Sequence, residues 1–180
     1  NTNDNNFIIS LYFLNKNFGY SILDNSTGEF YCGNSQINNL REIINKYEVK
    51  EILISKEQEY IISDLLGNIL ITTYDNWKTD KATCYDKLID HFGTKSLKGF
   101  GIENEDLCII SSGTCLDYLE TNYLKEMKHI NSISLLKDDG YMKLDSFTIK
   151  ILELFSSIND QGIRGTLINT INKTVTSQGE

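Results

Sequence analysis

The chain has 180 residues, of which 40% are hydrophobic, and its formal net charge at pH 7 is −8. This length suits one medium domain, or one domain plus part of another, and the apolar fraction is enough for a core. The acidic balance disfavours binding to nucleic acid and to anionic membranes, because like charges repel. No apolar run reaches the roughly 18 residues of a membrane span, and the polar opening NTNDNN does not resemble a signal peptide.

The N-terminal part of the chain predicts a three-stranded antiparallel meander. Apolar and aromatic runs at 6–15 and 18–25 are typical of buried strands, and a shorter strand follows at 29–33. Tight turns at 15–17 and 26–28, rich in Asn, Ser, Thr and Gly, connect the three strands.

From residue 35 onward, helices and strands alternate. Apolar residues at helical spacing predict a helix over 35–49 with Ser35 as its N-cap, and a second helix is predicted over 57–67. Short apolar strands are predicted at 50–56 and 69–75. Such alternation favours a parallel extension of the meander, and therefore a mixed α/β sheet with flanking helices. The ribonuclease-H-like topology fits this order of elements.

The remaining sequence is predominantly helical. Helices are predicted over 80–92, 107–123, 146–157 and 164–174, with an extended stretch at 141–145. The single tryptophan, Trp77, is expected to pack against the sheet edge; the alternative is an exposed contact residue. The absence of an initiator Met and the abrupt end at TVTSQGE lead us to interpret the chain as a piece of a longer protein.

The cysteines and histidines do not predict a metal site. His91 and His129 are far apart, and neither has a cysteine or carboxylate at ligand spacing. No C-x-x-C pair occurs, so buried free thiols in a reducing cytoplasm are expected rather than disulfides. The four cysteines are Cys32, Cys84, Cys108 and Cys115.

The glycine-containing stretch KGFGIEN, residues 98–104, fails the tests for a phosphate-binding loop. A Walker loop has its Lys and hydroxyl residue after the second glycine, and the dinucleotide motif needs a third glycine where Asn104 stands. We therefore interpret Gly99 and Gly101 as residues that let the backbone turn tightly. Three apolar neighbours are then expected to insert into the core: Leu97, Phe100 and Ile102.

Several stretches, in order, resemble the bacterial MutS mismatch-repair proteins. FGYSILDNSTGEFY (18–31) resembles a hairpin of the MutS connector domain, and HFGTKSLKGFGIEN (91–104) resembles a loop later in that domain. SSGTCLDYLE (111–120) is similar to the small-residue-rich helix that follows it. HINSIS (129–134) and YMKLDSFTIKILELF (141–155) resemble the segments that open the MutS core domain.

The resemblance implies a fold, a role and a set of partners. Residues 1–130 would be a ribonuclease-H-like connector domain, and 131–180 would begin the core (lever) domain. The connector relays nucleotide state between the ATPase and the mismatch-binding end, receives MutL, and has no catalytic, cofactor or metal residues of its own. ATP, Mg²⁺ and mismatched duplex DNA would bind other domains of a homodimeric, cytoplasmic, nucleoid-associated parent.

Helix 80–92 offers the candidate surface for MutL. Its apolar positions recur at helical spacing and are expected to face the sheet: Cys84, Tyr85, Leu88, Ile89 and Phe92. Asp86, Lys87 and Asp90 then point away from the sheet, where charges can set orientation and association rate. These three residues are the predicted docking surface.

Two other functions are alternatives to the connector role. A ribonuclease-H-like nuclease needs clustered carboxylates for two metal ions, one of them inside the first strand. That strand contains no Asp or Glu, and Asp24 and Glu29 flank a turn, where a solvated role is the more ordinary one. A free-standing interaction domain unrelated to repair is the third interpretation, and the ordered resemblance disfavours it.

Overall fold

The computed structural model describes residues 7–63, 69–123, 127 and 129–136. The chain divides into two units, 1–138 and 139–180, and all the described residues belong to the first. The extended stretch predicted at 141–145 and the helices predicted at 146–157 and 164–174 lie outside the described residues.

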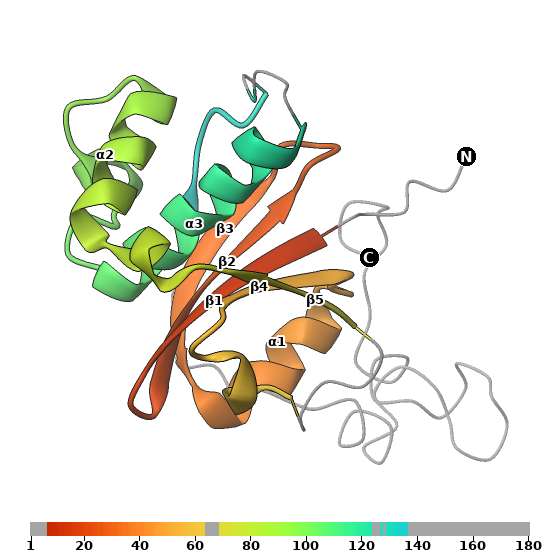
Figure 1. Cartoon of the computed structure of the whole chain (residues 1–180). Helices are drawn as coiled ribbons and strands as arrows, with labels where there is room; N and C mark the ends of the chain where they lie inside the picture. Colours follow the sequence, from red (N-terminus) through yellow and green to blue (C-terminus); the bar gives the residue numbers. More distant parts are fainter. Residues whose placement is uncertain (1–6, 64–68, 124–126, 128, 137–180) are drawn as a thin grey trace, which may run out of the picture. The chain divides into compact units, whose positions relative to one another are not determined.

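The strands of the described residues form one mixed sheet in the order β5-β4-β1-β2-β3-β6 (Figure 1). β1, β2 and β3 are an antiparallel meander; β4 runs parallel to β1, β5 to β4, and β6 to β3. The predicted meander and its parallel extension are confirmed. The bounds are β1 Phe7–Leu14, β2 Asn17–Asp24, β3 Phe30–Gln36, β4 Glu51–Ser55, β5 Leu70–Tyr74 and β6 Ser134–Leu135.

Two turns set the register of the meander. Leu14 pairs with Asn17, so only two residues connect β1 to β2, and Asn15 takes the left-handed conformation with φ 57°. Asparagine tolerates that conformation better than most residues. In the second turn, Gly28 has φ 80°, and its N–H donates to the carbonyl oxygen of Asp24.

The helix predicted over 35–49 is shorter than expected, and Ser35 is not its N-cap. Ser35 pairs with Phe18 inside β3, because the strand continues along β2 as far as Gln36. A 3-10 turn at Ile37–Asn39 then leads into α1, Leu40–Lys46. Hydrogen bonds to the neighbouring strand therefore outweighed the helical spacing of the apolar residues.

The helix predicted over 57–67 is also wrong for its described part, which contains only a 3-10 turn at Glu59–Ile61; Gly67 lies outside the described residues. Gln58 supplies a physical reason. Its side-chain amide donates to the carbonyl oxygen of Phe13 at 2.8 Å and accepts from the Phe13 N–H at 3.0 Å. These bonds hold the segment against the end of β1.

Helices cover both faces of the sheet (Figure 1). One face carries α1, and the other carries α2, Lys81–Phe92, and α3, Asp106–Tyr123, as predicted for 80–92 and 107–123. Alternate residues of β1 divide between two cores: Ile9 belongs to the α1 side and Ile8 to the α3 side. Within the part of the chain that the structure describes, no helix is long and apolar enough to cross a membrane.

Helix α3 lies between the sheet and α2 (Figure 1) and is buried on nearly all sides. Its approach to β2 is close, since a Cβ on Gly19 would overlap the backbone carbonyl of Leu107. Buried hydroxyls join the two layers: Ser21 donates to the carbonyl oxygen of Ser111 at 2.8 Å, and the Ser10 and Thr114 hydroxyls are 2.9 Å apart. The polar groups buried by this close packing are therefore largely satisfied.

The loop between α2 and α3 has the predicted structural role. Leu97 and Ile102 are fully buried, and Phe100 packs on Phe92 with ring centroids 4.8 Å apart. Gly101 has φ 76° and ends the 3-10 turn Leu97–Phe100. Gly99 has no positive φ, so only one of the two glycines is required by the backbone.

We expect Gly101→Val to lower the free energy of unfolding by about 1–3 kcal/mol, because a β-branched residue is strained at positive φ. Gly99→Val is the matched control in the same loop, since a Cβ there meets nothing within 4 Å. Chemical denaturation measures both variants. Equal loss of stability in the two would show that backbone conformation is not the cause.

Candidate interaction surface on helix α2

Both ends of α2 are fixed by local structure. The Asp80 carboxylate accepts hydrogen bonds from the Thr83 N–H at 2.9 Å and from the Thr83 hydroxyl at 2.8 Å, which makes it the N-cap. Gly93 closes the other end with φ 61°. The side chains on the outer side of α2 therefore project from a helical backbone whose two ends are fixed.

The apolar stripe of α2 is confirmed, but its partner is not the one expected. Cys84 and Leu88 are buried, and Tyr85, Ile89 and Phe92 are half-buried against the same core. The stripe packs on α3 rather than on the sheet, because α3 occupies the space between them. No local pattern in the sequence indicates that one helix covers another on this face.

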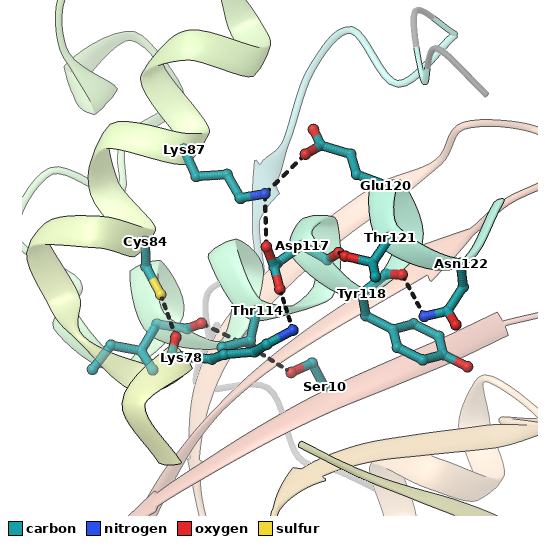
Figure 2. A network of polar contacts seen from close by, with 11 residues as sticks. Ser10, Lys78, Cys84, Lys87, Thr114, Asp117, Tyr118, Glu120, Thr121 and Asn122 are labelled. Carbon is teal, nitrogen blue, oxygen red and sulfur yellow. Dashed lines mark hydrogen bonds and ion pairs between the residues drawn. The ribbon is translucent and has the colours of Figure 1, made fainter. Parts of the chain in front are cut away.

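The three predicted docking residues do not share one free surface. Asp86 and Asp90 are exposed, as expected. Lys87 is only 25% exposed, and its ammonium contacts Asp117 and Glu120 of α3, both at 2.8 Å (Figure 2). The expectation that Lys87 points away from the fold is therefore corrected: it joins α2 to α3.

Lys87 belongs to a larger cluster that we call the α2–α3 ion network, made of Lys78, Lys87, Asp117 and Glu120. Asp117 is its centre, with Lys78 at 2.7 Å on one oxygen and Lys87 on the other (Figure 2). Burial raises the pKa of Asp117, but hydrogen bonds and charge from the two lysines outweigh burial and hold it below 3.8. Burial likewise lowers the pKa of Lys87, and its carboxylate partners raise it above 10.5 overall.

Sequence reasoning missed Asp117 and Lys78. Their partners are 30 or more positions away along the chain, so no local spacing marks them. It also misplaced Trp77, which does not pack against the sheet edge: the residue is 70% exposed. The 3-10 turn Asn76–Thr79 carries the ring outward immediately after β5.

Of the two carboxylates that a nuclease could use, Asp24 serves a turn. Asp24 is buried, and one of its oxygens accepts from the Ser26 N–H at 2.8 Å and from the Ser26 hydroxyl at 2.6 Å. Burial raises the pKa of Asp24, but bonds from Ser26 and Thr27 lower it overall. Glu29 is exposed, and no group of three or more His, Cys, Asp or Glu residues able to hold a metal occurs among the described residues.

The four cysteines are buried free thiols, as predicted. Burial raises the pKa of Cys84 to about 12 and that of Cys115 to about 12. Neither is therefore a thiolate near neutral pH, so neither has the character of a reactive nucleophile.

The mixed sheet, with a helical layer on each face, defines an α/β domain. The family model described as MutS domain II matches residues 6–131. The chain belongs to this MutS family.

Relatives named DNA mismatch repair protein MutS match almost the whole chain. Those of Parabacteroides distasonis and Bacteroides thetaiotaomicron are 36% and 35% identical over 180 residues, covering 99% of this chain and 20% and 21% of the relative. The MutS of Flavobacterium psychrophilum is 37% identical over 182 residues, covering 99% of this chain and 21% of the relative. The chain thus spans about a fifth of the length of the curated relatives it matches.

Asp117→Asn tests the ion network, since it keeps the shape of the side chain and removes its charge. At pH 7 we expect the free energy of unfolding to fall by roughly 1 kcal/mol. Because the pKa of Asp117 is lower in the folded state than in the unfolded state, its negative charge stabilises the fold at pH values above the unfolded-state pKa. This stabilisation is lost as the pH falls through the folded-state pKa. The difference between wild type and variant should therefore close below about pH 4.

Denaturant titrations at several pH values measure this effect. Asp86→Asn is the control, because this exposed carboxylate on α2 is outside the network and should change stability by less than about 0.5 kcal/mol. A stability difference that does not vary with pH would contradict the ionic origin of the effect.

Proposed function

We propose that this chain is the connector of a MutS-type mismatch-repair protein: a non-catalytic domain that relays nucleotide state within the parent and docks MutL. The observation that carries the proposal is the family match over 6–131 together with the near-complete alignment to MutS proteins. The strand order β3-β2-β1-β4-β5, with the last two strands parallel to β1, supports a ribonuclease-H-like fold for the domain. In this proposal, residues 1–130 are the connector and 131–180 begin the core domain.

A relay requires a part that moves as a unit, and the packing supports this. Helix α3 contacts the sheet on one side and α2 on the other, while the α2–α3 ion network joins the two helices. A displacement applied to the sheet would therefore carry α2 with it. The nuclease alternative finds no support, because β1 carries no carboxylate and Asp24 is committed to a turn.

The MutL-docking surface is proposed on the exposed side of α2, centred on Asp86 and Asp90. Both carboxylates are exposed on a helix whose two ends are capped. Lys87 contributes by holding the helix in place through Asp117 and Glu120. Mismatched DNA, ATP and Mg²⁺ are proposed to bind other domains of a homodimeric parent.

The docking test is Asp86→Lys together with Asp90→Lys in the full-length parent, with cross-linking to its MutL in the presence of mismatched DNA and ATP. Reversing both charges should reduce the cross-linked product, mainly through slower association. Glu57→Lys with Glu59→Lys is a matched control, since these exposed carboxylates on the β4–β5 connection change charge equally. Undiminished cross-linking by the α2 variant would remove this surface but not the family assignment.

The proposal assigns no nucleotide site to this chain. Gly101 turns the loop, and the buried Leu97 and Ile102 fill the space beside it. Calorimetric titration of the chain with Mg-ATP should therefore give no binding heat. Micromolar affinity would contradict the assignment of ATP to another domain.

A further inference from the structure

Strand β3 has a neighbouring strand on both sides at its start but on only one side at its end. β2 pairs with the whole of β3, whereas β6 pairs only with Tyr31 and Cys32. The last bond on the β6 side runs from the Leu136 N–H to the Cys32 carbonyl oxygen at 2.7 Å. Over residues 33–36, the described part of the chain therefore leaves one edge of β3 without a neighbouring strand.

The hydrogen-bond pattern of the sheet determines which main-chain groups lie on this free edge. In an antiparallel pair, successive residues direct their N–H and C=O groups alternately toward and away from the partner strand. The Cys32 carbonyl points toward β6, so the main chain of Asn34 and the N–H of Gln36 also point away from β2. Among the described residues, none forms a hydrogen bond with the main chain of Asn34. The edge therefore offers two donors and one acceptor to an added strand.

This part of the edge has none of the usual protection against pairing with another chain. Exposed edges are commonly protected by charged side chains, by proline or by bulges. Residues 33–36 are Gly, Asn, Ser and Gln, which carry no charge, and their register with β2 is continuous. The Asn34 side chain is bound to α3, where its amide donates to Glu105 and its oxygen accepts from the Cys108 thiol. The edge is therefore held extended and is left uncovered by the side chain of Asn34.

A hollow of about 600 Å³ adjoins the same residues of β3. Its lining comes from the ends of β2 and β3, the turn before α1 and the start of α3: Asn17, Asn34, Ser35, Gln36, Asn39 and Leu107. All of these except Leu107 have uncharged polar side chains, whereas small-molecule sites are mostly apolar. A polar hollow beside unpaired main-chain groups suits an extended polypeptide better, because main-chain amides supply the matching acceptors and donors.

The side chains around the hollow indicate the chemistry of that polypeptide. Asn17 and Gln36 are opposite each other on β2 and β3, and both are exposed. Their side-chain amides have no hydrogen-bond partner among the described residues. Because amides both donate and accept, they suit uncharged polar side chains such as those of asparagine, serine and threonine. Glu105, which binds Asn34, disfavours an acidic occupant.

We propose that the free edge of β3 at residues 34–36 is a binding site for an extended, uncharged polar segment of a partner protein. The segment adds to the sheet beside β3, past the end of β6, and forms hydrogen bonds with the main chain of Asn34 and the Gln36 N–H. Its side chains occupy the adjoining hollow. The site is separate from the exposed carboxylates of α2, since none of the residues that line the hollow belongs to that helix.

Amide hydrogen exchange of the 180-residue chain, followed by NMR, is the first test. Without a ligand, the Asn34 N–H should exchange faster than the Ser35 N–H, which points toward β2. The probe is a short peptide of threonine, asparagine and serine with blocked ends. At saturation it should slow exchange at Asn34 and Gln36 by about tenfold or more and leave Ser35 unchanged. Slow exchange at Asn34 without peptide would show that this chain covers its own edge, and would overturn the proposal.

Two substitutions at Gln36 separate its main chain from its side chain. Gln36 is extended, with φ −89° and ψ 148°, close to the backbone of proline at about −65°. Gln36→Pro removes an N–H from the edge and should weaken peptide binding by about tenfold, whereas Gln36→Ala keeps the N–H and should weaken it by less than about threefold. Chemical denaturation shows whether both variants fold. Equal binding by two folded variants would overturn the proposed strand addition.

Changes in the peptide test the same bonds without altering the protein. A peptide of the same sequence with its main-chain nitrogens methylated keeps the side chains but cannot donate from its main chain, so it should bind at least about tenfold more weakly. Aspartate in place of asparagine should also weaken binding, because of Glu105. Equal binding of the methylated peptide, or no change in exchange at Asn34 with millimolar unmethylated peptide, would overturn the proposal.

Discussion

The close seating of α3 between the sheet and α2 is the constraint on which the rest of the domain depends. It is possible because the contact positions are small: Gly19 lies under the backbone of Leu107, and Gly113 lies against Cys84. A larger residue at either position would separate two layers. The hydroxyl contacts of Ser10 and Ser21 with α3 satisfy polar groups that this packing removes from water.

This seating determines what α2 can present. Because α3 separates α2 from the sheet, α2 buries its apolar stripe on another helix and needs charged contacts to complete that interface. Asp117 supplies them by binding Lys78 and Lys87 together. As a consequence, Lys87, which helical spacing places on the outer side of α2, forms ion pairs with α3. The carboxylates on the outer side of α2, Asp86 and Asp90, remain exposed.

The same arrangement determines how the chain passes from β5 to α2. The chain must pass from the end of β5 to the start of α2, and the short turn Asn76–Thr79 makes this connection. Lys78 turns inward to Asp117, so its neighbour Trp77 is directed to solvent. The turn between β5 and α2 therefore both exposes the Trp77 ring and brings Lys78 into the ion network. The apolar ring lies next to charges that are already paired.

The local pattern of residues was sufficient to predict several elements. The apolar runs of β1 and β2, the tight turn at Asn15, the capped helix α2 and the turn at Gly101 follow from side-chain spacing and backbone preference within a few residues. The order of these elements also predicted the parallel extension by β4 and β5, since crossover connections require it. The sequence by itself also carried the resemblance to MutS, because that depends on motifs and not on contacts.

Only the tertiary structure decided where long-range hydrogen bonds and charges meet. Ser35 joined a strand because β2 offered backbone partners, and Gln58 bound Phe13 where helical spacing had predicted a helix. Asp117 of α3 forms an ion pair with Lys87 of α2. These outcomes depend on groups brought together from distant parts of the chain. Spacing along one element reports which face is apolar, but the neighbouring element determines what that face contacts and which charges remain free.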